Sequence, residues 1–128
     1  MSENEGPLRV LRGVIDAMNT GENTAGLANM TADVVIIDDV PPFHRTGHQE
    51  AELWFRRLAV ARSRLNASLS LGNADVRVEE DRAYIVGPGL FTGSLEGTDV
   101  DVNGTLTATL VQRHGTWLVD GLIWSCML

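Results

Sequence analysis

The sequence predicts an α+β fold in which helices from the first half of the chain pack on one face of a sheet formed largely by the second half. Apolar residues recur at helical spacing up to about Leu65, and four β-rich segments follow, joined by short polar connectors that suit hairpins. Helices followed by a run of strands are typical of this class. The 128 residues fit one domain, residues 1–128, of which we expect 1–6 to be disordered.

Three helices are expected before the β-rich half. The first begins near Pro7, which suits a first helical turn, and ends at the turn around Gly21. A short second helix fits residues 24–30 and a longer third helix fits 49–65. Apolar stripes predict a buried face on the first and third helices. These stripes are Leu8, Leu11, Val14, Ile15 and Met18, and then Ala51, Trp54, Phe55, Leu58, Ala61 and Leu65.

The strands are predicted from β-branched runs and turn residues. The first strand is expected at 33–38, and the prolines at 41 and 42 end it in a loop. Pro88, between two glycines, indicates a bulge or an edge position, because proline lacks the N–H that a central strand needs. The four later β-rich segments span about 66–79, 82–95, 100–113 and 116–126.

Composition argues against several classes of partner and site. The formal net charge of −7, with a pI of about 4.8, disfavours nucleic acid and anionic membranes, which bind basic surfaces. The single cysteine, Cys126, allows no intrachain disulfide, and its apolar surroundings favour an inert thiol. No two histidines have metal-ligand spacing on one element, so we expect no metal. The N-terminus lacks signal-peptide features and no apolar run approaches the ~20 residues of a membrane helix, so we expect a cytoplasmic protein.

The stretch VVIIDD, residues 34–39, ends the first strand with two adjacent carboxylates. Successive side chains of a strand point to opposite faces. Asp38 therefore shares a face with Val34 and Ile36, and Asp39 lies on the other. Both faces are apolar, so a carboxylate is expected to approach an apolar interior.

Three stretches carry a resemblance to a known family. AMNTGENTAGLANMTADVVIIDD (17–39) resembles a helix, an asparagine-glycine turn, a short helix and a first strand of that family. PFHRTGHQEAELWF (42–55) is similar to the segment that enters its third helix, and residues 81–125 resemble its last three strands. The family is the SnoaL-like branch of the nuclear transport factor 2-like superfamily, which includes ketosteroid isomerases and polyketide cyclases. The resemblance implies a cone-shaped roll: a curved, mixed or antiparallel sheet wraps around three helices, with an apolar pocket at its open end.

The resemblance assigns a candidate base. Isomerases of the family carry a carboxylate at the end of the first strand, and Asp38 matches this position. Burial at an apolar pocket mouth strengthens a carboxylate as a base. The isomerases also need two oxyanion donors, which fall at Val14 and at Ala108 or Thr109. Valine and alanine cannot donate, and losing one such donor typically costs ~10²–10³ in rate, which argues against steroid isomerisation.

For three residues, Asp38, His44 and Tyr84, the sequence leaves two alternatives open. Asp38 either faces the pocket as a base or caps the loop and pairs with Arg45. His44, in the loop, either moves a proton together with Asp38 or is exposed and inactive. Tyr84 either places its hydroxyl in the pocket or faces solvent. The other expected pocket-lining residues are Val14, Met18, Phe43, Trp54 and Leu58.

The last strand predicts an outer apolar stripe. Strand alternation places Trp117, Val119, Ile123 and Ser125 towards the helices, by the family pattern. Leu118, Leu122 and Trp124 then lie on the outer sheet face, and an exposed apolar stripe suggests a partner. Because sheet-to-sheet dimers are common in the family, we expect a homodimer through these residues.

The sequence therefore supports two hypotheses. The first is a cofactor-independent isomerase, cyclase or dehydratase that acts on a hydrophobic, carbonyl-bearing small molecule, with Asp38 as general base and His44 as its partner. The second is a non-catalytic domain for hydrophobic-ligand binding or dimerisation, which the missing oxyanion donors favour.

Overall fold

The computed structural model describes residues 5–126, which form three helices and one seven-stranded sheet. The helices are α1 (Glu5–Thr20), α2 (Asn23–Ala28) and α3 (Gly47–Leu65). The strands are β1 (Met30–Ile37), β2 (His44–Thr46), β3 (Ser68–Leu71), β4 (Asp75–Glu79), β5 (Arg82–Leu95), β6 (Thr98–Arg113) and β7 (Thr116–Cys126). The predicted α+β class is confirmed, and the segment expected at 66–79 divides into β3 and β4.

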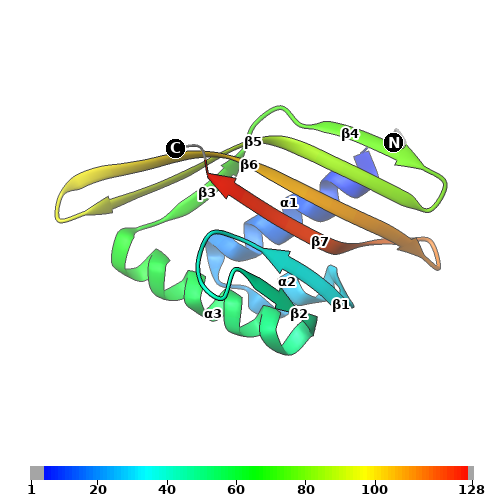
Figure 1. Cartoon of the computed structure of the whole chain (residues 1–128), viewed down its shortest axis with the longest axis horizontal. Helices are drawn as coiled ribbons and strands as arrows, with labels where there is room; N and C mark the ends of the chain where they lie inside the picture. The colour runs from blue at the N-terminus through cyan, green and yellow to red at the C-terminus, as the bar shows by residue number, and fades with distance from the viewer. Residues whose placement is uncertain (1–4, 127–128) are drawn as a thin grey trace.

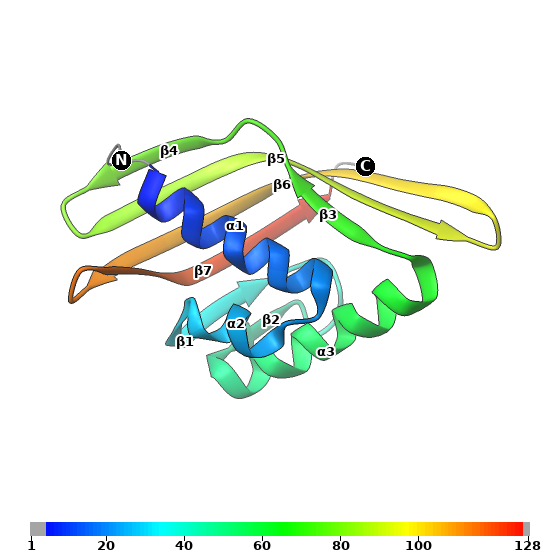
Figure 2. The same ribbon diagram turned by 180° about the vertical axis from the view of Figure 1, so that it is seen from behind.

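The sheet is mixed, with strand order β2-β1-β7-β6-β5-β3 and with β4 paired to β5. β1 runs parallel to β7, and every other pairing is antiparallel. The helices lie on one face of the sheet; Figure 2 shows α1 crossing that face, with α2 and α3 beside β1 and β2. The opposite face of the sheet is turned to the viewer in Figure 1. The arrangement agrees with the predicted roll around three helices.

The core lies between α1 and the inner sheet face. Leu11 and Val14 of α1 are fully buried, as the helical stripe predicted, and Ile85, Leu110 and Val119 of the sheet are buried at 1% exposure or less. A side chain of this size stabilises the fold by about 1.5–3 kcal/mol when it is fully buried. This core fixes the position of α1 relative to the strands that line the site described below.

Pro88 marks the place where β5 changes its neighbour. β4 pairs with β5 up to Val86 and β3 pairs with it from Gly89, while the pairing of β5 with β6 continues without a bulge. The carbonyl of Pro88 accepts a bond of 2.9 Å from the N–H of Gly72, so this residue points its backbone towards the β3/β4 edge. The N–H that proline lacks would face the same edge, where no ladder bond is needed.

The last strand contains a β-bulge at Asp120. Thr109 pairs with Gly121 while Leu110 pairs with Val119, so Asp120 has no partner on β6. One extra residue reverses the alternation of the side chains that follow it.

The bulge overturns the predicted direction of the residues after Asp120. Val119 and Leu122 are both buried, at 0% and 2% exposure, and Trp124 lines the cavity on the helix side. The prediction that Leu122 and Trp124 lie on the outer face, with Ile123 and Ser125 inside, is wrong for this reason.

The segment expected to be disordered, residues 1–6, lies partly outside the described residues. Of the segment 1–6, residues 1–4 fall outside the structure that is described, whereas Glu5 and Gly6 already belong to α1. Gly6 lies against Trp117, since a Cβ there would be 3.2 Å from the indole Cδ1 atom. None of the helices within residues 5–126 combines the length and the hydropathy that a membrane crossing requires.

Candidate functional site

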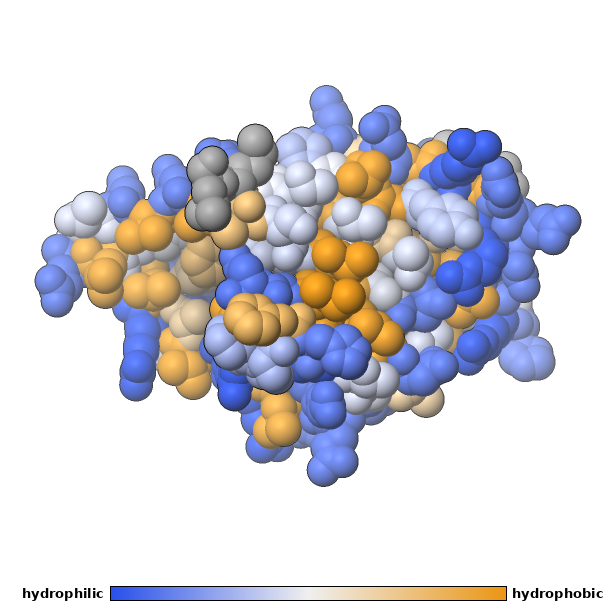
Figure 3. Space-filling view, in the orientation of Figure 1, coloured by the Kyte–Doolittle hydropathy of each residue, from blue (hydrophilic) through white to orange (hydrophobic). Residues whose placement is uncertain are grey.

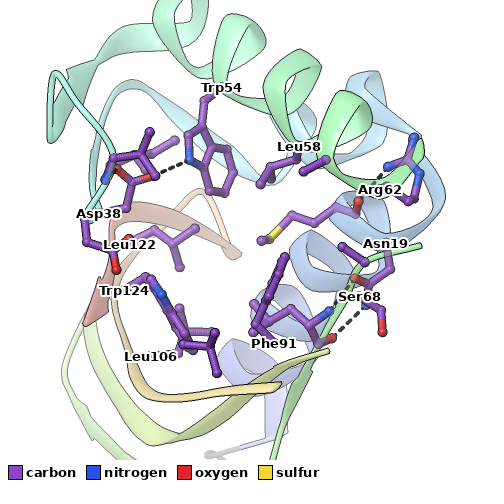
Figure 4. A pocket seen from close by; sticks show the side chains of 18 of the residues that line it. Asn19, Asp38, Trp54, Leu58, Arg62, Ser68, Phe91, Leu106, Leu122 and Trp124 are labelled. Carbon is purple, nitrogen blue, oxygen red and sulfur yellow. Dashed lines mark hydrogen bonds between the residues drawn. The ribbon is translucent and has the colours of Figure 1, made fainter. Parts of the chain in front are cut away.

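A cavity of about 310 Å³ opens between α1, α3 and the inner face of the sheet. This volume lies at the lower end of the range of ~300–1,000 Å³ that is typical of small-molecule sites. Most of its wall is apolar, and its polar side chains gather at two ends (Figure 4). The apolar wall includes Met18, Leu58, Phe91, Leu106, Leu122 and Trp124.

Asp38 forms one polar end of the cavity. It follows directly after β1, on the same face as the buried Val34 and Ile36, as alternation predicted. Its Oδ1 atom accepts the N–H of Val40 over 3.1 Å, and this bond fixes the start of the loop. The side chain keeps 12% of its exposure, so the carboxylate is largely withdrawn from water but reachable from the cavity.

Arg45 and Trp54 hold the carboxylate of Asp38. Arg45 Nη1 donates to Oδ1 over 3.0 Å, and Trp54 Nε1 donates to Oδ2 over 3.0 Å (Figure 4). Arg45 stands opposite Ile36 in the β1–β2 pair, so both side chains point to the inner face. The side chain of Arg45 is 6% exposed, which makes this a buried ion pair rather than a surface one. Trp54 comes from the apolar stripe of α3 and ties that helix to the end of β1.

The other polar end lies where α1 meets β3. The amide of Asn19 donates to the carbonyl of Leu69 and accepts its N–H, both over 2.8 Å. Arg62 Nη1 donates to the carbonyl of Met18 over 2.9 Å, and Ser68 shares a bond of 3.1 Å with Thr92. These bonds join α1 to β3 and to α3, and β3 to β5, around the cavity.

Solved structures share this architecture across nearly the whole chain. An NTF2-like protein with a cystatin-like fold from Novosphingobium aromaticivorans superposes with a TM-score of 0.85 at 14% identity, covering 98% of this chain and 82% of the other. A candidate scytalone dehydratase from the same species gives 0.81 at 16% identity, with 97% and 83% covered. A candidate calcium/calmodulin-dependent protein kinase II association domain from Xanthomonas campestris gives 0.77 at 22% identity, with 94% and 84% covered.

The chain has the NTF2-like, cystatin-like fold. The resemblance found in the sequence is thereby confirmed at the level of the fold. No protein-family model matches the chain, and no curated protein matches it. TM-scores of this size establish the fold, whereas identities of 14–22% leave the chemistry to the residues of the cavity.

Within the NTF2-like fold, the structure brings together only some of the predicted site residues. Asp38, Met18, Trp54 and Leu58 line the cavity as expected. Val14 does not, because it is fully buried between α1 and the sheet.

The other three predicted side chains point away from the cavity. His44 pairs with Ile37 of β1 and is exposed, and its Nε2 atom lies 3.1 Å from the hydroxyl of Thr46. Of the two alternatives for His44, the structure agrees with the exposed one, and the pair with Asp38 is not formed. Phe43 adopts a φ of 70° and is 53% exposed. Tyr84 lies on the outer sheet face at 45% exposure, so its hydroxyl does not enter the pocket.

Several lining residues escaped the sequence prediction. Trp124 and Leu122 were placed outside because the bulge at Asp120 left no signal in the alternation. Asn19 was assigned only to a turn, since its partner Leu69 lies 50 residues away. Arg45 is not a lining residue. It forms the pair with Asp38 that the sequence left open as an alternative, because the β1–β2 pairing turns its side chain to the inner face.

Asp39 lies at the rim of the cavity, where it is more exposed than Asp38 and accepts fewer hydrogen bonds. Its Oδ2 atom accepts the thiol of Cys126 over 2.7 Å. That bond raises the pKa of the Cys126 thiol, because it stabilises the protonated form. Among residues 5–126, no cluster of three His, Cys, Asp or Glu side chains is arranged to hold a metal ion.

Proposed function

We propose that the protein is a small-molecule enzyme of the SnoaL-like type, an isomerase, cyclase or dehydratase, with Asp38 as general base. The substrate is a hydrophobic molecule that bears a carbonyl group. One observation carries the proposal: Asp38 is a largely buried carboxylate at the end of a mostly apolar cavity. A base in such a place can remove a proton from a bound molecule that is shielded from water.

The hydrogen bonds of Asp38 leave it able to accept a proton. A carboxylate offers about four lone-pair sites. Oδ1 uses two of them for Val40 and Arg45, whereas Oδ2 uses one for Trp54. Oδ2 therefore keeps one free lone-pair site, and the three hydrogen bonds fix the plane of the carboxylate.

The proposed step breaks a C–H bond next to the substrate carbonyl. The proton moves to Asp38, and the electron pair of that bond forms an enolate. Return of the proton to a different carbon isomerises the substrate. Loss of a hydroxyl from the carbon next to the enolate dehydrates it, because the departing hydroxide takes the proton from Asp38 and leaves as water. Attack of the enolate carbon on a second carbonyl closes a ring, and the alkoxide that forms takes the proton from Asp38. All three outcomes need only a base and an oxyanion donor, so no cofactor is proposed. The fold shared with a candidate scytalone dehydratase supports this class of chemistry.

Hydrogen exchange in D₂O tests the proposal without knowledge of the natural substrate. The wild type should accelerate exchange of the α-protons of 2-tetralone, a small bicyclic ketone, as followed by ¹H NMR. Asp38→Asn should lower that acceleration by about 10²–10⁴, the usual contribution of a general base. Asp39→Asn is the matched control and should retain exchange. Equal rates for wild type and Asp38→Asn, or no acceleration by the wild type, would count against the proposal.

The non-catalytic alternative has its own supporting observation. Asp38 is paired with Arg45, and the same fold occurs in a candidate kinase association domain. Under that alternative, the cavity only binds ligands. A protein that binds 2-tetralone but does not accelerate its exchange would favour this second function.

We propose that the protein is a homodimer through the outer sheet face, with a corrected set of residues. Figure 3 shows hydrophobic residues gathered in the middle of this face, over β1 and β7. Strand pairing aligns Ile37, Ile123, Thr107 and Val86 in one row across β1, β7, β6 and β5. The row replaces Leu122 and Trp124, while Leu118 stays outside by alternation with the buried Val119.

Sedimentation of a charged variant tests the dimer. Val86 is 42% exposed, and Val86→Asp would place a carboxylate within the proposed apolar interface. We expect a dimeric wild type and a monomeric variant in analytical ultracentrifugation. Val60→Asp, on α3 and 51% exposed, is the control and should stay dimeric. A monomeric wild type would contradict the interface.

A further inference from the structure

The polar side chains of the cavity differ in whether the protein already satisfies them. Trp54 donates its indole N–H to Asp38, and both ends of the Asn19 amide are bonded to Leu69. The hydroxyl of Ser68 shares a bond with Thr92. Each of these groups has a hydrogen-bond partner within the protein, and these bonds hold the walls of the cavity in place.

Arg62 also keeps N–H groups beyond the one that bonds the carbonyl of Met18, but Trp124 differs from all of these groups in having no partner at all among the described residues. Trp124 lines the cavity, yet its indole N–H makes no hydrogen bond to any of residues 5–126. Within residues 5–126, the only fully buried side-chain polar atom without a hydrogen-bond partner is the hydroxyl oxygen of Thr31. The indole nitrogen of Trp124 also lacks a partner, so it is not fully buried and a bound molecule can reach it. An indole N–H is a donor only, so it suits an oxygen of a bound molecule.

The strand register places Trp124 beside Asp38. β1 and β7 are parallel neighbours, with Ile36 opposite Leu122 and Ile37 opposite Ile123. The next residues, Asp38 directly after β1 and Trp124 on β7, therefore follow side by side at the end of this pairing. Both side chains line the cavity, on the wall that also carries Leu122 (Figure 4).

Two glycines fix the ring of Trp124. Gly89 and Gly104 are direct partners on β5 and β6, and a Cβ at either position would lie 2.6 Å from the indole ring. The ring therefore packs directly on the backbone of these strands, where any other residue would displace it. A donor held in this way needs little reorganisation when a ligand arrives.

We propose that the indole N–H of Trp124 binds the carbonyl oxygen of the substrate and stabilises the enolate that forms when Asp38 removes the neighbouring proton. This proposal rests on the proposed function for its catalytic part. It supplies an oxyanion donor that the matched positions do not offer, because Val14 and Ala108 are buried and apolar and the hydroxyl of Thr109 donates to Asp120. The proton goes to Asp38, the negative charge develops on oxygen, and the Trp124 bond strengthens as it does. It also defines the ligand class: a compact apolar molecule with a carbonyl oxygen next to an acidic C–H.

NMR of the indole N–H groups tests this donor directly. The chain has three tryptophans, so its ¹⁵N–¹H spectrum contains three indole signals, and Trp124→Phe identifies one of them. Addition of 2-tetralone should move the Trp124 signal downfield, whereas tetralin, the hydrocarbon without the oxygen, should not. Calorimetry should show that the wild type prefers 2-tetralone over tetralin, and that Trp124→Phe reduces this preference about 3- to 10-fold, the range of one hydrogen bond.

The possible outcomes separate this proposal from the proposed function. Asp38→Asn should keep the 2-tetralone shift of the Trp124 signal while losing exchange. Trp124→Phe should lower exchange by about 10²–10³. A Trp124 signal that responds equally to both compounds, or no binding of either, overturns the donor role. A normal shift together with undiminished exchange in Asp38→Asn overturns the base and leaves the donor standing.

Discussion

At the β1 end of the cavity an ion pair sets the geometry, whereas at the α1 end a neutral amide does so. Asp38 is held by Arg45 and Trp54 and keeps a free lone pair on Oδ2. Asn19 makes two bonds to the backbone of Leu69 and has its partners within the fold. The first end can therefore exchange a proton with a ligand, while the second end holds α1 against β3. The two ends should respond to mutation in different ways, which the following experiments use.

The largest loss of stability is expected from a mutation at the charged end of the cavity, where Asp38 and Arg45 pair. Arg45→Met removes the cation and leaves the buried carboxylate of Asp38 without its partner. Breaking a buried ion pair in this way costs about 3–5 kcal/mol, so the urea midpoint should fall strongly. The double variant Arg45→Met with Asp38→Asn removes both charges and should recover most of the loss. A double variant no more stable than Arg45→Met would mean that Arg45 acts through packing alone.

A smaller effect is expected at the neutral end. Asn19→Ala removes both bonds to Leu69 and leaves an N–H and a carbonyl of β3 without protein partners. The expected cost is about 1–3 kcal/mol in urea unfolding, with exchange of 2-tetralone largely retained. Asn103→Ala, at an exposed site on β6, serves as the control and should be near neutral. Loss of exchange in folded Asn19→Ala would show that this end also takes part in the chemistry.

Local sequence patterns were sufficient to predict the direction of side chains where the alternation of a strand is unbroken. Between Val34 and Asp38 the buried face can be followed residue by residue, so the inward direction of Asp38 could be predicted. The stripe of α3 gave Trp54 and Leu58 in the same way. Such predictions depend only on the period of the element and need no partner.

The prediction of side-chain direction failed where the backbone at a single position departs from the regular strand. The bulge at Asp120 is stabilised by partners on other strands: Thr109 donates to it over 2.7 Å and Arg82 over 3.1 Å. No local pattern encodes such contacts. The direction of Phe43 depends on a left-handed φ that a phenylalanine rarely adopts. The candidate donor Trp124 was misplaced for the first of these reasons.

The amide of Asn19 has a consequence for the state of the protein in solution. β3 is an edge strand, and an edge strand exposes backbone groups to which a strand of another chain can pair. Asn19 occupies both backbone groups of Leu69 and so stands where an added strand would begin its ladder. The side chain that closes one end of the cavity thus also protects the sheet from growing by strand addition along this edge.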